Sequence, residues 1–134
     1  MSTDPRIQSF LAGTPHAVVG ASENRNKYGN KVLRSYMQNS LPVYPIHPTA
    51  KKVEGLTAYP DLHSLPVTVH GISIITPPAI TEQVVQAAAA LGIKHIWMQP
   101  GAESQAAIDF ATSNAINLIE GDACLLVAIG FHDV

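Results

Sequence analysis

The stretch that decides the fold of this chain is Ala17-Val18-Val19-Gly20-Ala21-Ser22-Glu23-Asn24-Arg25-Asn26-Lys27-Tyr28-Gly29. A short apolar run ends at Gly20, a polar loop follows, and a pattern of helical period begins directly after it. A strand, a tight turn and a helix N-terminus in this order offer backbone N–H groups to a phosphate. The stretch therefore predicts an α/β domain with a nucleotide-type ligand at the turn.

The composition is that of one globular domain, which we expect to span residues 1–134. The 134 residues are 46% hydrophobic and 13% charged, enough to bury a full core. The net charge of −2, without a long run of one sign, argues against a nucleic-acid binder with a basic face. Cys124 is the only cysteine, and no apolar run approaches the ~20 residues that span a bilayer. Because no signal-peptide pattern occurs either, we expect a cytoplasmic protein without a membrane partner.

Strand and helix patterns alternate along the chain. Short continuous apolar runs predict strands at 16–20, 41–46, 56–59, 67–76, 94–98 and 116–119. Helical spacing of apolar residues predicts helices at 4–13, 30–39, 81–91 and 103–112, with one or two turns at 60–65. The apolar run 124–129 fits either a helix or an extended segment.

This alternation predicts a Rossmann-like three-layer α/β sandwich with a mainly parallel sheet. If 56–59 is the third strand at one edge, the strand order is 3-2-1-4-5-6. The order then reverses beside the first strand, and a crevice opens there between the carboxyl ends of two strands. Gly20-Ala21-Ser22 and Thr76-Pro77-Pro78 are predicted to face each other across this crevice.

The turn at Gly20 has the residues expected to hold a phosphate. Gly20 and Ala21 allow a phosphate to approach the backbone, and the Ser22 hydroxyl can donate to it. Arg25 and Lys27 can add positive charge at the rim of the loop. The spacing is G-A-S-x-x-x-x-K-x-G rather than G-x-G-x-x-G, so a plain strand-to-helix turn also fits.

The end of the strand at 41–46 bears on the identity of the nucleotide. An NAD site usually has an acidic residue about 20 residues past the glycines, but this segment reads Tyr44-Pro45-Ile46-His47-Pro48. Lys51 and Lys52 follow, and they suit a ligand with an additional phosphate near the ribose, as in NADP and coenzyme A. A solvated loop explains the two lysines equally well.

No set of residues predicts catalysis or a metal site. The six histidines lack a ligand spacing such as H-x-x-x-H, and no G-x-S-x-G motif occurs. His47 is expected to contact the ligand, whereas His70 and His95 fit structural roles. Cys124 has no basic cluster near it in the sequence, which favours a buried, inert thiol.

Five short motifs occur in a fixed order, and together they resemble one family. They are AVVGAS at 17–22, VYPIHP at 43–48, GLTAYP at 55–60, IITPP at 74–78 and IWMQPG at 96–101. The set resembles stand-alone CoA-binding domain proteins, which are similar to the N-terminal domain of the succinyl-CoA synthetase alpha subunit. The resemblance covers roughly residues 13–127.

This resemblance implies a domain that binds coenzyme A or an acyl-CoA at the crevice, as a carrier, a sensor or a detached subunit. The residues that it implies at the ligand follow the ends of the strands: Gly20, Ala21, Ser22, Lys27, His47, Pro48, Lys51 or Lys52, Thr76, Pro77, Pro78, Gln99, Pro100 and Gly101. Many relatives have Asn, Ser or Thr where this chain has His47.

The sequence is also compatible with other functions. The related synthetases need a second domain with a phosphorylated histidine and an ATP-grasp partner, so we expect no stand-alone synthetase activity. An NADP-dependent oxidoreductase or a redox-sensing NAD(P) domain is one alternative. An interaction subunit whose crevice no longer binds a ligand is another. The apolar composition also favours a homodimer.

Overall fold

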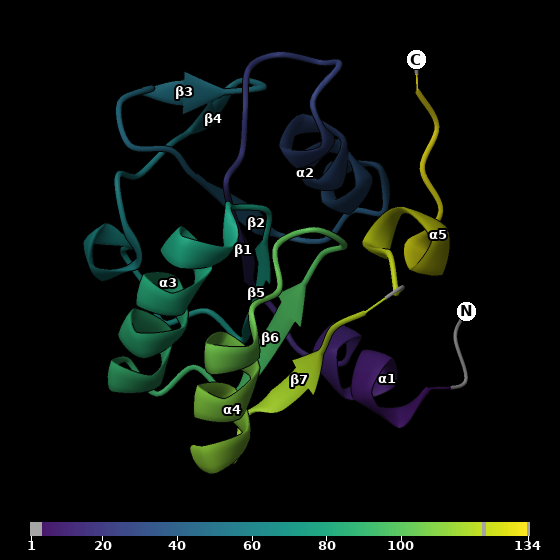
Figure 1. Ribbon diagram of the computed structural model, residues 1–134. Helices are drawn as coiled ribbons and strands as arrows, with labels where there is room; N and C mark the ends of the chain where they lie inside the picture. Colours follow the sequence, from purple (N-terminus) through teal and green to yellow (C-terminus); the bar gives the residue numbers. More distant parts are fainter. Residues whose placement is uncertain (1–3, 122, 134) are drawn as a thin grey trace.

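Short apolar runs that end in turns form the five strands of one parallel sheet in the computed structural model of this protein (Figure 1). The structure describes residues 4–121 and 123–133. The strands are β1 (His16–Val19), β2 (Val43–Ile46), β5 (Gly71–Ile74), β6 (His95–Met98) and β7 (Asn117–Ile119). Their order is β2-β1-β5-β6-β7, and every neighbouring pair is parallel. The Rossmann-like α/β class predicted from the alternating pattern is therefore confirmed.

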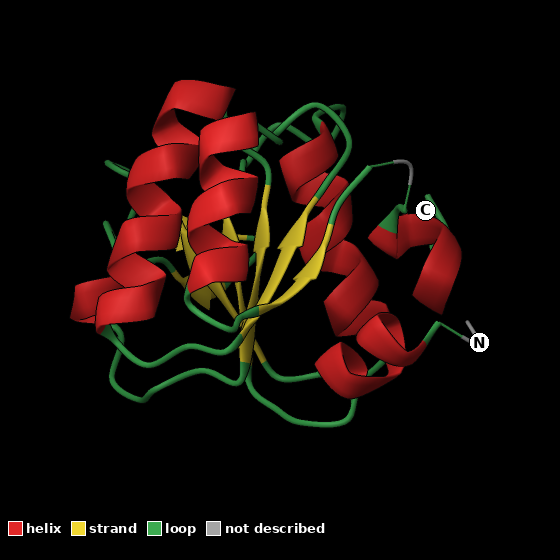
Figure 2. Cartoon of the chain, turned by 60° about the horizontal axis from the view of Figure 1, so that its bottom comes forward, coloured by secondary structure: helices red, strands yellow, loops and turns green. Residues whose placement is uncertain are grey.

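Helices cover both faces of the sheet (Figure 2). One face carries α3 (Pro78–Ala90) and α4 (Gln105–Ser113), and the other carries α1 (Pro5–Leu11), α2 (Tyr28–Gln38) and α5 (Leu125–Ile129). Side chains alternate between the two faces along each strand. On β1, Ala17 and Val19 pack in one apolar cluster, and Val18 packs in the other. The continuous apolar runs of the sequence are thus strands buried on both sides.

The predicted strand order is wrong at one edge, because residues 56–59 do not form a third strand of the main sheet. Leu56–Thr57 (β4) pair antiparallel with Lys52–Val53 (β3) in a separate hairpin. Glu54 and Gly55 link these strands with φ angles of 50° and 80°. Positive φ at both central residues is the geometry of a two-residue hairpin turn, which folds β4 back onto β3.

The hairpin stays attached to the sheet through Tyr59. The Tyr59 N–H donates to the Pro45 carbonyl (3.0 Å), and the Tyr59 carbonyl accepts from the His47 N–H (2.9 Å). Pro45 has no N–H, so this part of the β2 edge offers an acceptor without the neighbouring donor. The contact at Tyr59 is a parallel bridge to Ile46.

Capping chemistry sets the helix ends. The Asp4 side chain accepts from the Arg6 N–H at the start of α1, as expected, and the Ser104 side chain accepts from the Ala107 N–H at the start of α4. Helix α3 begins at Pro78 rather than at the predicted 81, because proline suits the first helical position. A one-turn helix at Leu62–Ser64 and the helix α5 complete the fold. The ambiguous run 124–129 is therefore helical over most of its length.

Three histidines gather at the amino ends of the strands, away from the Gly20 turn. The rings of His16 and His70 lie 5.7 Å apart, and those of His70 and His95 stack at 4.2 Å. Nε2 of His16 lies 2.8 Å from the Phe10 carbonyl oxygen, and Nε2 of His70 lies 3.0 Å from that of Ser9. These carbonyls belong to the last turn of α1, where helical partners are missing. The cluster thus holds α1 against the sheet.

Acid should weaken the fold through His16. Burial is the main cause that lowers the pKa of His16 from 6.5 to about 4, and His70 and His95 add to it. The pKa of His16 is lower in the folded state than in the unfolded state, so protonation favours unfolding. The fold therefore has its full stability above pH 6.5, where the ring is neutral in both states. The contribution of His16 is lost as the pH falls toward 4 and amounts to about 3 kcal/mol, at ~1.4 kcal/mol per pKa unit. Denaturant titrations between about pH 7.5 and 4.5 would measure the decline in unfolding free energy.

The His16→Phe variant is the control for this prediction. It keeps a ring beside Phe10 and Tyr36 but removes the titrating group. Its unfolding free energy should change less over the same pH range, with a remainder from His95, whose pKa burial also lowers. A pH dependence equal to that of the wild type would show that His16 is not responsible.

Candidate functional site

The turn after β1 and the turn after β5 touch at the carboxyl end of the sheet. The Ile75 N–H donates to the Val19 carbonyl (2.8 Å), and Gly20 has a φ of 99°. A Cβ on Gly20 would collide with the Ile75 carbonyl oxygen, and a Cβ on Gly29 would collide with the Gly20 carbonyl oxygen. Strand, turn and helix α2 are thus closer here than any side chain permits. The sheet order reverses at this point, since β2 and β5 flank β1.

This crowding predicts a matched pair of glycine variants. Gly20→Ala and Gly92→Ala both place a side chain at positive φ, at 99° and 77°, but only at Gly20 does the new Cβ meet other atoms within 4 Å. Both variants therefore bear backbone strain, and overpacking should cost Gly20→Ala about 1–3 kcal/mol more in unfolding free energy. Denaturant titration of both variants measures the difference. Equal losses would mean that the close approach contributes nothing to stability.

Two pockets open from the crevice and share Thr76. The first, called the Ile80 pocket, has a volume of about 480 Å³ and is lined mainly by Gly20, Ile46, Pro48, Leu62, Ile80 and Val84. The second, called the Cys124 pocket, has a volume of about 540 Å³ and is lined mainly by Tyr28, Thr76, Pro77, Gly101, Ala102 and Cys124. The crevice therefore continues to both sides of the Gly20 turn.

The Ile80 pocket is apolar and has a polar rim. Its walls come from the ends of β1 and β2 and from α3, and Asp61 and His63 lie at its border. Apolar walls with a few polar groups at the edge suit a flat heteroaromatic ring. Pro48, which is predicted to contact the ligand, lies in this wall, whereas the apolar residues of α3 were not assigned to the site.

A hydrogen-bonded chain of three side chains borders the Cys124 pocket. The Tyr28 hydroxyl donates to Gln99 Oε1 (3.1 Å) and forms a second hydrogen bond with Cys124 Sγ. Gln99 Oε1 also accepts from the Leu125 N–H (3.0 Å) at the start of α5. Burial first, and the Cys124 hydrogen bond second, raise the pKa of Tyr28, so this phenol stays neutral.

The expectation of a buried thiol is wrong, because Cys124 is half-buried and lines a pocket. Gln99, in contrast, was predicted at the ligand but is 0% exposed, and its side chain accepts a hydrogen bond from the Tyr28 hydroxyl. Tyr28 and Cys124 are 96 residues apart, so spacing in the sequence could not pair them. The fold brings Cys124 and Leu125 to Tyr28 and Gln99, the latter directly after β6.

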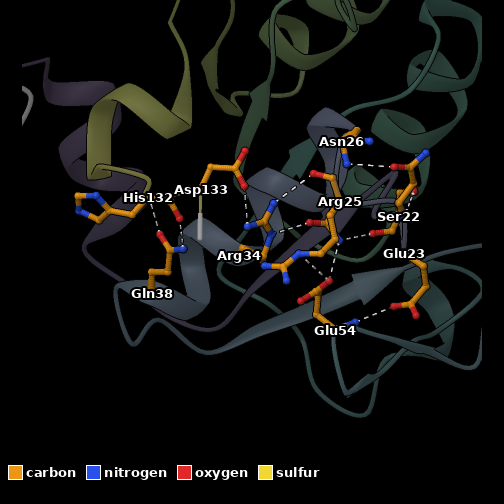
Figure 3. Close-up of polar contacts among 11 residues, drawn as sticks. Ser22, Glu23, Arg25, Asn26, Arg34, Gln38, Glu54, His132 and Asp133 are labelled. Atoms are coloured by element: carbon orange, nitrogen blue, oxygen red, sulfur yellow. Dashed lines mark hydrogen bonds and ion pairs between the residues drawn. The ribbon is translucent and has the colours of Figure 1, made fainter.

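The loop after Gly20 is held by side chains that hydrogen-bond its backbone (Figure 3). Ser22 Oγ accepts from the Asn24 N–H (3.1 Å), a bond that leaves the hydroxyl hydrogen to donate elsewhere. Asn30 Nδ2 donates to the Ser22 carbonyl (2.8 Å), and Arg34 Nη2 donates to the Arg25 carbonyl (3.2 Å). Ala21 lies in the core at 3% exposure, so only its backbone can reach a ligand. The supporting residues Asn30 and Arg34 were not predicted.

The basic residues predicted at the rim lie on the surface. Arg25, Lys27, Lys51 and Lys52 are all exposed. Arg25 Nε lies 3.9 Å from a carboxylate oxygen of Glu54, which belongs to the β3–β4 turn. The loop and the hairpin thus form one rim, whose positive charge is partly balanced by an acid.

His47 is turned back onto its own loop. Its Nδ1 accepts from the N–H groups of Thr49 (3.1 Å) and Ala50 (2.9 Å). A ring nitrogen that accepts carries no proton, so the neutral ring has its hydrogen on Nε2. His47 shapes the loop beside Pro48, and the ligand contact predicted for it stays a prediction.

The segment after β5 forms the wall between the two pockets. Thr76 lines both, and its Oγ1 lies 2.7 Å from Thr81 Oγ1 in the first turn of α3. Pro77 lines the Cys124 pocket, and the exposed Pro78 begins α3 outside both. The predicted residues that line the two pockets are Gly20, Pro48, Thr76, Pro77, Pro100 and Gly101.

A parallel sheet with a glycine turn and two pockets at its switch point defines a Rossmann-like ligand-binding domain. Residues 15–130 match the model of the CoA binding domain family, so the chain belongs to this family, as its five motifs predict. The domain is related to part of the acyl-CoA synthetases.

Known relatives agree with this assignment. The ADP-forming acetate–CoA ligase II of Archaeoglobus fulgidus is 31% identical over 94 residues, which are 69% of this chain and 14% of the ligase. The chain thus spans a small part of the length of that relative. A conserved hypothetical protein from Pyrococcus furiosus has a TM-score of 0.80 and 35% identity, covering 84% of this chain and 97% of its own.

A second solved structure shares the fold at lower identity. The hypothetical protein from Pyrococcus horikoshii has a TM-score of 0.87 and 21% identity, with 95% of this chain and 89% of that one covered.

Within residues 4–121 and 123–133, no group of three or more His, Cys, Asp or Glu is placed to hold a metal ion. Nor is any described helix long and apolar enough to cross a membrane.

Proposed function

We propose that this protein binds coenzyme A or an acyl-CoA in the crevice between β1 and β5. The observation that carries the proposal is the pair of pockets that meet at Thr76, one on each side of the Gly20 turn, in a member of the CoA binding domain family. Coenzyme A has a purine at one end, phosphates within it and a thiol at the far end of a flexible chain. A ligand of that form needs two separate pockets joined by an anion site.

Each part of the crevice suits one part of this ligand. The apolar walls of the Ile80 pocket suit the adenine ring, and the Gly20–Ser22 turn suits the pyrophosphate. Arg25, Lys27, Lys51 and Lys52 are exposed at the rim and can reach the ribose phosphate. The pantetheine chain then runs past Thr76 and Pro77 into the Cys124 pocket.

The role that fits this site is carriage, sensing or supply of coenzyme A to another protein. The chain matches 14% of the acetate–CoA ligase, and the proposed part is the ligand-binding one. A free Cys124 thiol agrees with action in a reducing compartment such as the cytoplasm. Homodimer formation, expected from the composition, stays a prediction.

An acidic residue in the adenine pocket should weaken binding of coenzyme A. Ile80 and Val67 are similarly exposed, at 43% and 46%, but only Ile80 lines the Ile80 pocket. Ile80→Glu removes an apolar contact and adds a charge of the same sign as the phosphates, so the Kd should rise at least about tenfold, or about 1.4 kcal/mol. Val67→Glu, as the matched control, should leave the Kd nearly unchanged. Isothermal titration calorimetry with coenzyme A measures both.

NADPH provides the comparison between ligand classes. Wild-type protein that binds NADPH at least as tightly as coenzyme A would favour the oxidoreductase alternative. Protein that binds neither ligand would favour an interaction subunit. Equal affinities of the Ile80→Glu and Val67→Glu variants for coenzyme A would show that adenine does not bind in the Ile80 pocket.

Ligand protection of Cys124 tests the other end of the site. Because Cys124 is the only cysteine and is half-buried, N-ethylmaleimide should label it alone. Acetyl-CoA has no free thiol, and at about ten times its Kd it should slow labelling about tenfold by occupying the pocket. The control ligand, adenosine 3′,5′-bisphosphate, lacks pantetheine and should not protect. Intact-mass spectrometry follows the reaction, and equal rates with both ligands would place pantetheine elsewhere.

A further inference from the structure

We infer that Arg34 and Asn30 are positioning residues for ligand binding: they hold the loop at 22–26 in the shape that receives the phosphates, although neither lines the Ile80 pocket or the Cys124 pocket. The inference rests on the proposed binding of coenzyme A and adds the residues on which the loop depends. Both belong to α2 and are four positions apart, so they lie on one helical face. Both are buried, at 4% exposure for Arg34 and 0% for Asn30.

Arg34 uses three guanidinium nitrogens for three different segments. Nε donates to Asn30 Oδ1 (2.6 Å), Nη2 to the Arg25 carbonyl (3.2 Å) and Nη1 to Asp133 (3.2 Å). Figure 3 shows the guanidinium between Arg25 of the loop and Asp133 of the C-terminal segment. A planar fork of donors can serve such divergent acceptors, whereas an ammonium group is a single point.

Asn30 links Arg34 to the start of the loop through hydrogen bonds. Its amide oxygen accepts from Arg34, and its Nδ2 donates to the Ser22 carbonyl (2.8 Å) and to a Glu54 carboxylate oxygen (2.9 Å). The amide is thereby oriented, and the β3–β4 hairpin is joined to the loop. Two loop carbonyls, those of Ser22 and Arg25, are thus held toward α2.

Pinned carbonyls also orient N–H groups. In a trans peptide the C=O and the following N–H point in opposite directions. With the Ser22 carbonyl held by Asn30, the Glu23 N–H points away from that side chain. A bound anion needs N–H groups that already point outward, because turning a peptide on binding would cost affinity.

A role in packing alone does not account for these contacts. Burying a guanidinium carries a large desolvation cost, and well-packed apolar residues often stabilise a site as well as a buried ion pair does. Its carboxylate partner, Asp133, is 59% exposed, so this ion pair contributes little to the free energy of unfolding. The guanidinium also lies over the Phe131 ring, 5.0 Å from its centroid. The remaining hydrogen bonds of Arg34 go to the Arg25 carbonyl of the loop and to Asn30, which supports the loop.

The test compares Arg34→Lys with Asp133→Asn by calorimetric titration with coenzyme A. Arg34→Lys keeps the charge and the aliphatic stem but cannot reach Asn30 and the Arg25 carbonyl in the same fork geometry. Its Kd should rise at least about tenfold. Asp133→Asn removes the exposed acid and leaves both loop contacts, so its Kd should stay within about twofold of the wild type.

Thermal unfolding of each variant separates positioning from stability. Titrations are made well below each midpoint, where nearly all protein is folded, so lost stability alone cannot change the Kd. Asn30→Ser is the second variant: it removes the bonds to Ser22 and Arg34 and should weaken binding in the same direction. Folded Arg34→Lys and Asn30→Ser with the wild-type Kd would overturn the inference, as would Asp133→Asn with a loss equal to that of Arg34→Lys.

The outcome for the wild type distinguishes the two proposals. If wild-type protein does not bind coenzyme A, the proposed function fails, and this inference fails with it. If the wild type binds and the variants bind equally well, only the positioning role is lost.

Discussion

The structure depends on one close approach of backbone to backbone. Gly20 follows β1 with a positive φ, and its missing side chain lets the Ile75 carbonyl lie against it. Gly29, at the start of α2, makes room in turn for the Gly20 carbonyl. Strand β1, strand β5 and helix α2 therefore meet at a single point without side chains between them. The crevice and both pockets begin there, because larger residues would push these elements apart.

The surroundings of this point combine rigid and open parts. Behind the loop, Arg34 and Asn30 occupy buried positions and hydrogen-bond its carbonyls. In front of it, the rim has exposed basic side chains and two pockets of different character. A rigid rear wall keeps backbone donors oriented, and an open front admits a long ligand. The proposed role, binding of coenzyme A, needs no catalytic group.

Much of the fold could be predicted because its signals are local. Apolar runs, helix caps and the glycine turn mark the elements within a few residues, and alternation of strand and helix implies the parallel sheet. The prediction for residues 56–59 was wrong for a tertiary reason. The Glu54–Gly55 turn folds Leu56 and Thr57 back onto β3, and Tyr59 bridges to Ile46 of β2. Among the predicted site residues, Gly20, Thr76 and Pro77 line the pockets, since they follow strands at the switch point.

The sequence by itself determined the order of elements, the glycine turn and membership of the CoA binding domain family, because motifs and periodicity are written in neighbouring residues. The tertiary structure alone decided which distant residues meet. Tyr28, Gln99 and Cys124 form one chain of hydrogen bonds although 71 and 96 residues separate Tyr28 from its partners. It also decided exposure, which placed Cys124 in a pocket and Gln99 behind it. Such contacts arise from packing of whole elements, and no local pattern encodes them.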